Sequence, residues 1–486
     1  MSEKLLLLPV LLPLLSGIVT RFLHFRRKSI CNTIIFLAVL LNSLVILALL
    51  ISPPFAALTI LRFGGNSALV LKADGACKVF LALIAFLWPP STLYAFEYME
   101  HEEHLSRFYS FYLMCYGFTA GIALSANLIT MYIFYELLML FTIPLIAHKE
   151  NRHSLKAAGK FAVYSFAGAA FSLTGILMLF SRTGCTEFTF GGIYTNTGDT
   201  FLLIAYLLTF IGFGVKAGIF PLYGWLPSAC VAPAPADALL DAVAIMNCGV
   251  FACIRCGYYT FGPALLVGTW AQNIVLAVTV FTILFGSSMA LREQHLERRL
   301  AYSTISNISY ILFGTALMTT NGLLAAFSHM LFHSIIKLTL FSCAGAILCK
   351  TGREYAPETV GLGRRMPLTF CTIALAALAL TGTPPLPGFI SKLNLLFAAA
   401  EADSALPIAG IAALLISALL TAAYLLPLSV RAFLTVRETA CVYTERDRDP
   451  GLLMLIPFAI LSAAILVLGF CGTQLMELLK RIITGI

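Results

Sequence analysis

Four charged residues lie inside stretches that are otherwise as apolar as a membrane-spanning helix. They are Glu136, Lys216, Lys337 and Lys392. An ionised side chain at the bilayer centre is unfavourable by at least about 2.5 to 3.5 kcal/mol on insertion scales, so such residues usually face a protein interior or a water-filled path. The pattern predicts that the chain moves charge across a membrane.

A buried glutamate and a buried lysine can together act as a proton switch. A nearby carboxylate favours the charged amine, so opening or closing a Glu136–Lys216 pair would change how tightly the lysine holds its proton. The alternative is a static ion pair that locks two helices together, although apolar residues usually do that equally well.

Other polar residues could extend this site. His329, His333 and Lys337 are spaced four residues apart, so they share one helix face, and histidine titrates near neutral pH. His329 could equally be a packing histidine, and Lys392 could reach the membrane interface along its apolar stem. The hydroxyl and amide groups of Ser303, Thr304, Ser306, Asn307 and Ser309 could hold water or serve helix packing.

Asp237 and Asp241 stand one helical turn apart. They could titrate, bind a cation such as sodium through oxygen ligands, or simply favour a helix N-terminus after Pro235.

Two of the apolar stretches contain helix-breaking residues close to a lysine. Pro221 lies five residues after Lys216, and Pro384, Pro385 and Pro387 precede Lys392. A broken span is tolerated only where its backbone is buried in protein or lines a watery cavity. Paired breaks in two halves of a chain indicate an ion site between inverted repeats.

The composition requires a polytopic membrane protein. Hydrophobic residues make up 60% of the 486 residues and charged residues 11%, against roughly 25% charged in soluble domains. Apolar windows long enough to cross the bilayer predict an all-α protein with fourteen transmembrane helices in a single membrane domain, 1–486. The spans are 5–22, 30–51, 76–96, 108–126, 127–147, 160–181, 201–221, 235–259, 270–290, 301–319, 322–349, 368–399, 407–430 and 452–474.

The positive charges are distributed unequally between alternate loops. Arg107 and the clusters at 21–28, 149–160, 292–299, 350–365 and 431–448 place twenty of the 31 lysines and arginines on one side. Retained positive charge marks the cytoplasmic side, so both termini are predicted to face away from the cytoplasm. No basic domain remains for binding a nucleic acid.

We expect no metal or cofactor of the chain's own. Cys253 and Cys256 form a Cys-Ile-Arg-Cys run, but no second cysteine pair or nearby histidine completes a ligand set. Glycine-rich phosphate loops and haem attachment motifs are also absent from the sequence, so no catalytic redox site is expected.

Five segments in order resemble the antiporter-like, proton-translocating subunits of complex I, of multisubunit sodium/proton antiporters (the D-type subunit) and of membrane-bound hydrogenases. They are Tyr135–Leu137, Lys216–Pro227, Arg299–Ile305, His329–Lys337 and Gly388–Lys392. The resemblance implies fourteen core helices with two inverted five-helix repeats and discontinuous helices 7 and 12. The repeats would be 108–259 (helices 4–8) and 260–434 (helices 9–13), after three N-terminal helices (1–107) and before a C-terminal helix 14 (435–486).

The resemblance also implies roles for individual residues. Glu136 and Lys216 match the family's fifth-helix glutamate and seventh-helix lysine, His333 and Lys337 its central relay, and Lys392 the charged residue that ends the row at the outward half-channel. One departure is Asn247, where many members have lysine. Asp241 stands where some relatives have histidine, so it could replace the missing group.

These features predict a proton-translocating subunit of a complex I-like redox complex, a membrane-bound hydrogenase or a multisubunit cation/proton antiporter. Whether sodium is linked to the transport stays open. Its partners would be other membrane subunits, a peripheral redox arm and membrane lipids, in an energy-coupling membrane such as a bacterial or archaeal cell membrane. Two alternatives stay open: a scaffold that has lost transport, suggested by Asn247, and an autonomous secondary transporter, suggested by the broken helices.

Overall fold

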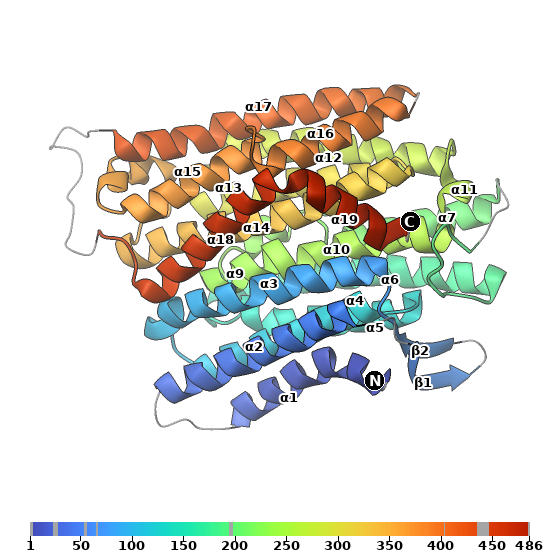
Figure 1. The fold of residues 1–486 in the computed structure, drawn as a ribbon, viewed down its shortest axis with the longest axis horizontal. Coiled ribbons are helices and arrows are strands. Elements are labelled where there is room, and N and C mark those ends of the chain that lie inside the picture. The colour runs from blue at the N-terminus through green and yellow to red at the C-terminus, as the bar shows by residue number, and fades with distance from the viewer. Residues whose placement is uncertain are drawn as a thin grey trace.

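The computed structural model describes residues 3–22, 28–52, 56–64, 67–193, 198–402, 404–434 and 447–484, most of them in helices that run side by side as one bundle (Figure 1). Four arginines that contribute to the predicted orientation, Arg26, Arg27, Arg437 and Arg446, lie outside the described residues. The helices of the first half are α1 (Leu8–Phe22), α2 (Lys28–Ile51), α3 (Gly75–Tyr98), α4 (Leu105–Leu124), α5 (Leu128–Ile146), α6 (Arg152–Thr183), α7 (Thr200–Gly214), α8 (Leu226–Ala229), α9 (Ala234–Leu239) and α10 (Ile245–Ile254). The second half has α11 (Pro263–Leu266), α12 (Trp270–Arg292), α13 (Leu296–Ala316), α14 (Thr320–Thr351), α15 (Pro367–Thr381), α16 (Pro387–Glu401), α17 (Ala405–Phe433), α18 (Leu452–Phe470) and α19 (Gly472–Thr484).

Among the described residues, ten helices are long and apolar enough to cross a membrane. The other four predicted spans coincide with helices that are more polar, shorter or interrupted. These are α4, α7, α13, and the pair α15 and α16. The multi-pass membrane architecture is therefore confirmed, whereas length and composition do not by themselves give fourteen crossings.

Two segments that carry candidate residues, Ala234–Phe261 and α14, are enclosed by the rest of the bundle. Every residue in the most apolar window of Ala234–Phe261 is buried, as is 89% of that window in α14. The corresponding share is 33% in α2 and in α17, which lie toward opposite edges of the view (Figure 1). Outer helices thus face the lipid, and the inner ones supply a protein interior for ionised groups.

Both predicted breaks are present. The first helix ends at Gly214, two residues before Lys216, and the chain resumes a helix only at α8. Gly218 takes a left-handed conformation, with a φ of 71°, which favours glycine. The second break separates α15 from α16 at residues 382–386, where Pro384 and Pro385 lack backbone donors, and Pro387 begins α16.

The helix predicted at 235–259 contains two π-helical turns, η3 (Leu240–Ala244) and η4 (Arg255–Phe261). Side chains take up carbonyls that the widened turns release. Asn247 Nδ2 donates to Ala242 O at 2.6 Å, and Thr260 Oγ1 donates to Arg255 O at 3.2 Å. Such turns often occur at functional sites, and Asp241 lies in the first of them.

Several elements outside the spans were not predicted. A hairpin of β1 (Leu58–Gly64) and β2 (Ser67–Leu71) forms in the connection after α2, with Thr59 opposite Val70. It docks on α5, because Val70 N donates to Thr130 Oγ1 and Asn127 Nδ2 donates to Ala68 O. Short 3-10 turns flank or link other helices: η1 (Glu3–Leu7), η2 (Met99–His101), η5 (Ala356–Thr359) and η6 (Leu362–Arg364).

The C-terminal segment is two helices rather than one. The predicted span 452–474 ends as α18 at Phe470, and α19 follows with its Ile482 backbone against Gly75 at the start of α3. An ion pair lies beside the start of α3, between the buried Arg255 and the partly exposed Asp74. Arg255 Nη1 and Nη2 each donate at 2.6 Å to one oxygen of Asp74, which also caps α3 through Cys77 N. This bidentate pair joins α3 to the middle of the bundle.

His148 makes folding stability depend on pH. It lies in the turn between α5 and α6, and burial followed by the nearby Arg107 guanidinium lowers its pKa to about 4. The unfolded chain has the ordinary value of about 6.5, so below that pH the unfolded state binds the extra proton and stability falls as pH decreases. We expect His148→Gln to flatten the fall in melting temperature between pH 7.5 and 5. The exposed control His153→Gln should retain the slope, and an equal slope in both variants would contradict this assignment.

Candidate functional site

The first charged pair joins α5 to the break after α7. Lys216 Nζ donates to Tyr135 O at 2.8 Å and lies 3.4 Å from Glu136 Oε1. The amine also lies 3.4 Å from the centroid of the Tyr135 ring, in a cation–π contact. Lys216 is 1% exposed and Glu136 18% exposed, so the lysine is held in the interior while its partner keeps access to the outside of the chain.

The backbone of the break is fixed around Lys216. Trp225 Nε1 donates to Val215 O at 2.9 Å, and Tyr135 Oη donates to Phe213 O at 2.9 Å. On the opposite side α10 approaches closely at Gly249. A Cβ built there would lie 2.7 Å from Ala217 N and 3.0 Å from Lys216 C.

We expect Gly249→Ala to lower stability and to displace the turn that carries Lys216. The contacted atoms belong to the backbone and cannot rotate away, and overpacking of this kind costs about 1–3 kcal/mol. Gly159→Ala is the matched control, because a Cβ at Gly159 in α6 meets nothing within 4 Å. Thermal unfolding in detergent should separate the two variants; equal melting temperatures would show that the approach at Gly249 is not tight.

A neutral hydrogen-bonded bridge follows the first pair. Asn247 Nδ2 lies 2.7 Å from Ser334 Oγ, which in turn donates to Met330 O at 2.6 Å. Ser334 lies on α14, three residues before Lys337. Asn247 Oδ1 is buried without a partner among the described residues. The residue that departs from the resemblance thus lies between the two halves and contacts the helix that carries the second lysine.

Lys337 and Asp241 are linked through α13. Lys337 Nζ donates to Leu300 O at 2.7 Å. The Thr304 hydroxyl lies 3.1 Å from the same carbonyl and 2.7 Å from Asp241 Oδ2. Because a hydroxyl has one proton, Thr304 can donate to the carbonyl or to the carboxylate at one time. The other oxygen, Asp241 Oδ1, is buried without a partner in the described part of the chain.

The two histidines continue along α14 toward the second break. The His329 and His333 rings stack with centroids 5.9 Å apart, and His329 stacks on Tyr310 at 5.2 Å. His329 Nδ1 lies 2.9 Å from Ser391 Oγ. Neither ring nitrogen of His333 has a partner among the described residues, which leaves both free to bond to water or a proton carrier.

Lys392 is held by the end of α15. Its Nζ donates to Leu380 O at 2.6 Å and Thr381 O at 3.0 Å, two carbonyls that the helix end leaves without intrahelical partners. The amine lies 5.5 Å from the Tyr310 ring centroid. The side chain is directed toward the break and is 8% exposed, so it does not extend to the surface as the interfacial alternative requires.

Two further buried carboxylates lie toward the end of the bundle that carries the basic loops. Asp237 on α9 is 4% exposed, with Oδ2 unpartnered in the described chain, and Glu297 at the start of α13 is 5% exposed. Glu297 was not predicted, because it lies in the basic run His295–Arg299 and outside the apolar window. The sequence signal that would have identified Glu297 is a single acid directly before the two arginines, Arg298 and Arg299, that mark the cytoplasmic side.

The described residues contain no group of three or more His, Cys, Asp or Glu side chains arranged to hold a metal ion. Cys253 and Cys256 are buried, and Cys253 Sγ contacts Phe210 O at 3.6 Å. The two carboxylates Asp237 and Asp241 therefore have no third ligand of this kind.

The family of the chain follows from its similarity to known proteins. Residues 125–421 match the family described as NADH:quinone oxidoreductase/Mrp antiporter, transmembrane. The chain belongs to this family. The matched region contains the candidate residues Glu136, Lys216, Asp241, His329, His333, Lys337 and Lys392.

Two relatives illustrate the range of the family. The NADH-quinone oxidoreductase subunit N of Desulforudis audaxviator is 30% identical over 421 residues, which is 84% of this chain and 83% of the relative. The D-type subunit of the Bacillus subtilis Na(+)/H(+) antiporter is 28% identical over 80% of this chain and 79% of its own length.

Two solved structures share the fold. A chain of the archaeal membrane-bound sulfane sulfur reductase complex superposes with a TM-score of 0.86 at 23% identity, over 99% of this chain and 97% of that one. A chain of the Mrp complex from Dietzia sp. DQ12-45-1b gives 0.84 at 21% identity, over 99% and 98%. The overall fold is thus that of these membrane subunits.

Proposed function

We propose that this family member is the proton-translocating membrane subunit of a multisubunit complex that either couples to a redox arm or exchanges cations for protons. The observation that supports this function most is the series of buried lysines at both helix breaks. Lys216 lies in the first break and donates to Tyr135 O, and Lys392 follows the second break and donates to Leu380 O. Lys337 lies on α14 and donates to Leu300 O. Relatives include subunits of both a quinone oxidoreductase and a Na(+)/H(+) antiporter.

In the proposed architecture the chain crosses the membrane fourteen times as two inverted repeats, 108–259 and 260–434. The short or interrupted helices α7, α15 and α16 count as crossings because their breaks are covered by protein. The basic loops face the cytoplasm, and both termini face away from it. The chain then belongs in a bacterial or archaeal energy-coupling membrane, surrounded by lipid and other membrane subunits.

The proposed sequence of events begins with a change in a partner subunit that alters the Glu136–Lys216 contact. When Glu136 moves away from the lysine, Lys216 Nζ loses the charge that favours its protonated form and releases its proton. Asn247 cannot carry this proton. Water molecules would therefore have to conduct the proton past the Asn247–Ser334 contact toward Lys337.

Asp241 is the counter-charge of Lys337, as Glu136 is of Lys216. The two groups are linked by the Leu300 carbonyl and the Thr304 hydroxyl, which lie between them. Asp237 and Glu297 extend this branch toward the basic end and would admit protons from the cytoplasm. The stacked pair His333 and His329 passes the proton to Lys392, which releases it outward. A membrane potential contributes about 2.3 kcal/mol per charge for each 100 mV.

The partners distinguish the proposed complexes. The chain would be purified from native membranes in mild detergent, and the co-purifying proteins identified by mass spectrometry. Iron–sulfur, nickel or flavin subunits would indicate a redox-driven pump, and small cation-antiporter subunits alone an exchanger driven by a gradient. A solitary chain would contradict membership in a complex and would favour the autonomous transporter. Flux measured with and without sodium tests the sodium-linked variant.

A further inference from the structure

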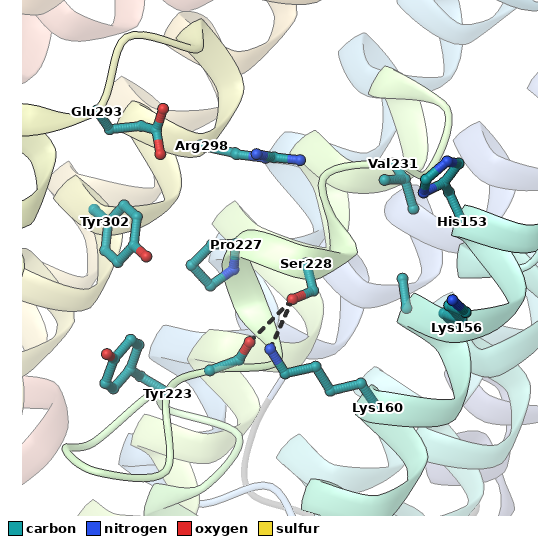
Figure 2. A pocket seen from close by; sticks show the side chains of 12 residues that line it. His153, Lys156, Lys160, Tyr223, Pro227, Ser228, Val231, Glu293, Arg298 and Tyr302 are labelled. Atoms are coloured by element: carbon teal, nitrogen blue, oxygen red, sulfur yellow. Dashed lines mark hydrogen bonds between the residues drawn. The ribbon is translucent and has the colours of Figure 1, made fainter.

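A basic cavity lies at the edge of the bundle where α6 begins. Its volume is about 460 Å³, within the range of roughly 300–1,000 Å³ that small-molecule sites occupy. Figure 2 shows that His153, Lys156 and Lys160 from α6 face it from one side, and Arg298 and Tyr302 from α13 face it from the other. The segment that follows the first break forms its floor.

The charges in the cavity suit a phosphate group. The side chains of Lys156 and Arg298 make no hydrogen bond or ion pair with another described residue, whereas Lys160 Nζ donates to Ser228 Oγ at 2.9 Å. Glu293 is the acid that lines the cavity, and its Oε1 already accepts from the backbone amides of Gln294 and His295. Three permanently charged cations and one carboxylate therefore line the cavity, which leaves an excess of positive charge. Charge-assisted hydrogen bonds from lysine and arginine to phosphate are strong.

The surroundings favour a lipid as the source of that phosphate. Phe285 and Phe281 lie seven and eleven residues before the end of α12, about 10 and 16 Å deeper along the helix axis. They pack with Phe220 and Tyr223 of the break segment, and the Phe281 side chain is 50% exposed. An apolar surface thus continues from the cavity toward the membrane interior, where the acyl chains of a lipid would lie.

We propose that this cavity binds the phosphate-bearing headgroup of an anionic phospholipid, with its acyl chains over the aromatic surface of Phe220, Phe281 and Phe285. A bound headgroup would also contact Tyr223 and Ser228, in the segment that Trp225 ties to Val215 beside Lys216. The lipid would thereby stabilise the break that positions the first lysine. Binding itself does not depend on the proposed transport function.

The test is native mass spectrometry of the delipidated full chain titrated with phosphatidylglycerol or phosphatidylcholine. We expect the double variant Lys156→Gln and Arg298→Gln to bind phosphatidylglycerol at least about tenfold more weakly, because each basic residue near the lipid surface adds to the attraction. The control is the double variant Lys149→Gln and Arg364→Gln, which removes the same charge from exposed positions outside the cavity and should stay within about twofold of the parent.

Three results would overturn the proposal. They are equal weakening in both double variants, equal affinity for phosphatidylglycerol and phosphatidylcholine, or saturation by inorganic phosphate without any binding of lipid. Because Lys156 and Arg298 are exposed, the variants should fold normally, and weaker binding would not be due to unfolding. Thermal unfolding of each variant checks this directly. The single variants Lys156→Gln and Arg298→Gln should each give part of the loss.

Discussion

Replacing Lys216 with alanine is expected to reduce proton translocation by the assembled complex by at least about 100-fold, which corresponds to about 2.7 kcal/mol in the barrier. The substitution removes the amine that lies beside Glu136 at the first break, and no other cation of the described residues forms an ion pair with that carboxylate. Flux would be measured as the quench of a pH-sensitive dye in inverted membrane vesicles. The complex should still assemble, because Glu136, which loses its partner cation, is 18% exposed rather than fully buried.

Two controls make this result specific. Arg152→Ala removes an exposed cation from the start of α6 and should leave flux unchanged. Glu136→Gln keeps the size of the partner but removes its charge, so it should also impair flux if the two residues act as a switch. Unchanged flux in Lys216→Ala, with normal assembly, would favour the scaffold alternative.

Replacing Asp241 with asparagine is expected to lower flux by at least about tenfold, or about 1.4 kcal/mol in the barrier. Asparagine can still accept from Thr304, but it has neither the negative charge that compensates Lys337 nor a site for a proton. The same dye assay measures the effect, with Glu401→Gln as a control that removes one carboxylate from an exposed position.

Thr304→Val separates the two contributions of Asp241. It keeps the carboxylate but removes the hydroxyl that lies 2.7 Å from Asp241 Oδ2 and near the Leu300 carbonyl. A loss in Thr304→Val that approaches that of Asp241→Asn would show that the hydrogen-bonded link matters as well as the charge. Full activity of Asp241→Asn would contradict this role, because it would show that neither the charge of Asp241 nor its capacity to hold a proton is needed.

Much of the central site can be predicted from the sequence because its signals are local. A lysine in an apolar window is conspicuous by the cost of burying it, and the prolines after Lys216 and before Lys392 mark the breaks directly. The spacing of His329, His333 and Lys337 places them on one helix face, as the structure has them.

Contacts between distant segments could not be predicted in this way. Asp241 and Thr304 are 63 residues apart, and Lys337 reaches a carbonyl that any residue at position 300 would offer. Only helix packing brings these groups together. The hairpin at 58–71 had a local signal, since short, mostly apolar runs flank Gly64-Gly65-Asn66, a turn-forming run. The membrane context of the neighbouring spans obscured it.

The most direct test of proton translocation is an electrical recording of the purified complex on a solid-supported membrane after a pH jump. The proposed proton path predicts a transient current that reverses with the pH gradient and disappears in Lys216→Ala. A current of the same size in that variant, or none in the parent complex under any gradient, would contradict a proton path through this chain.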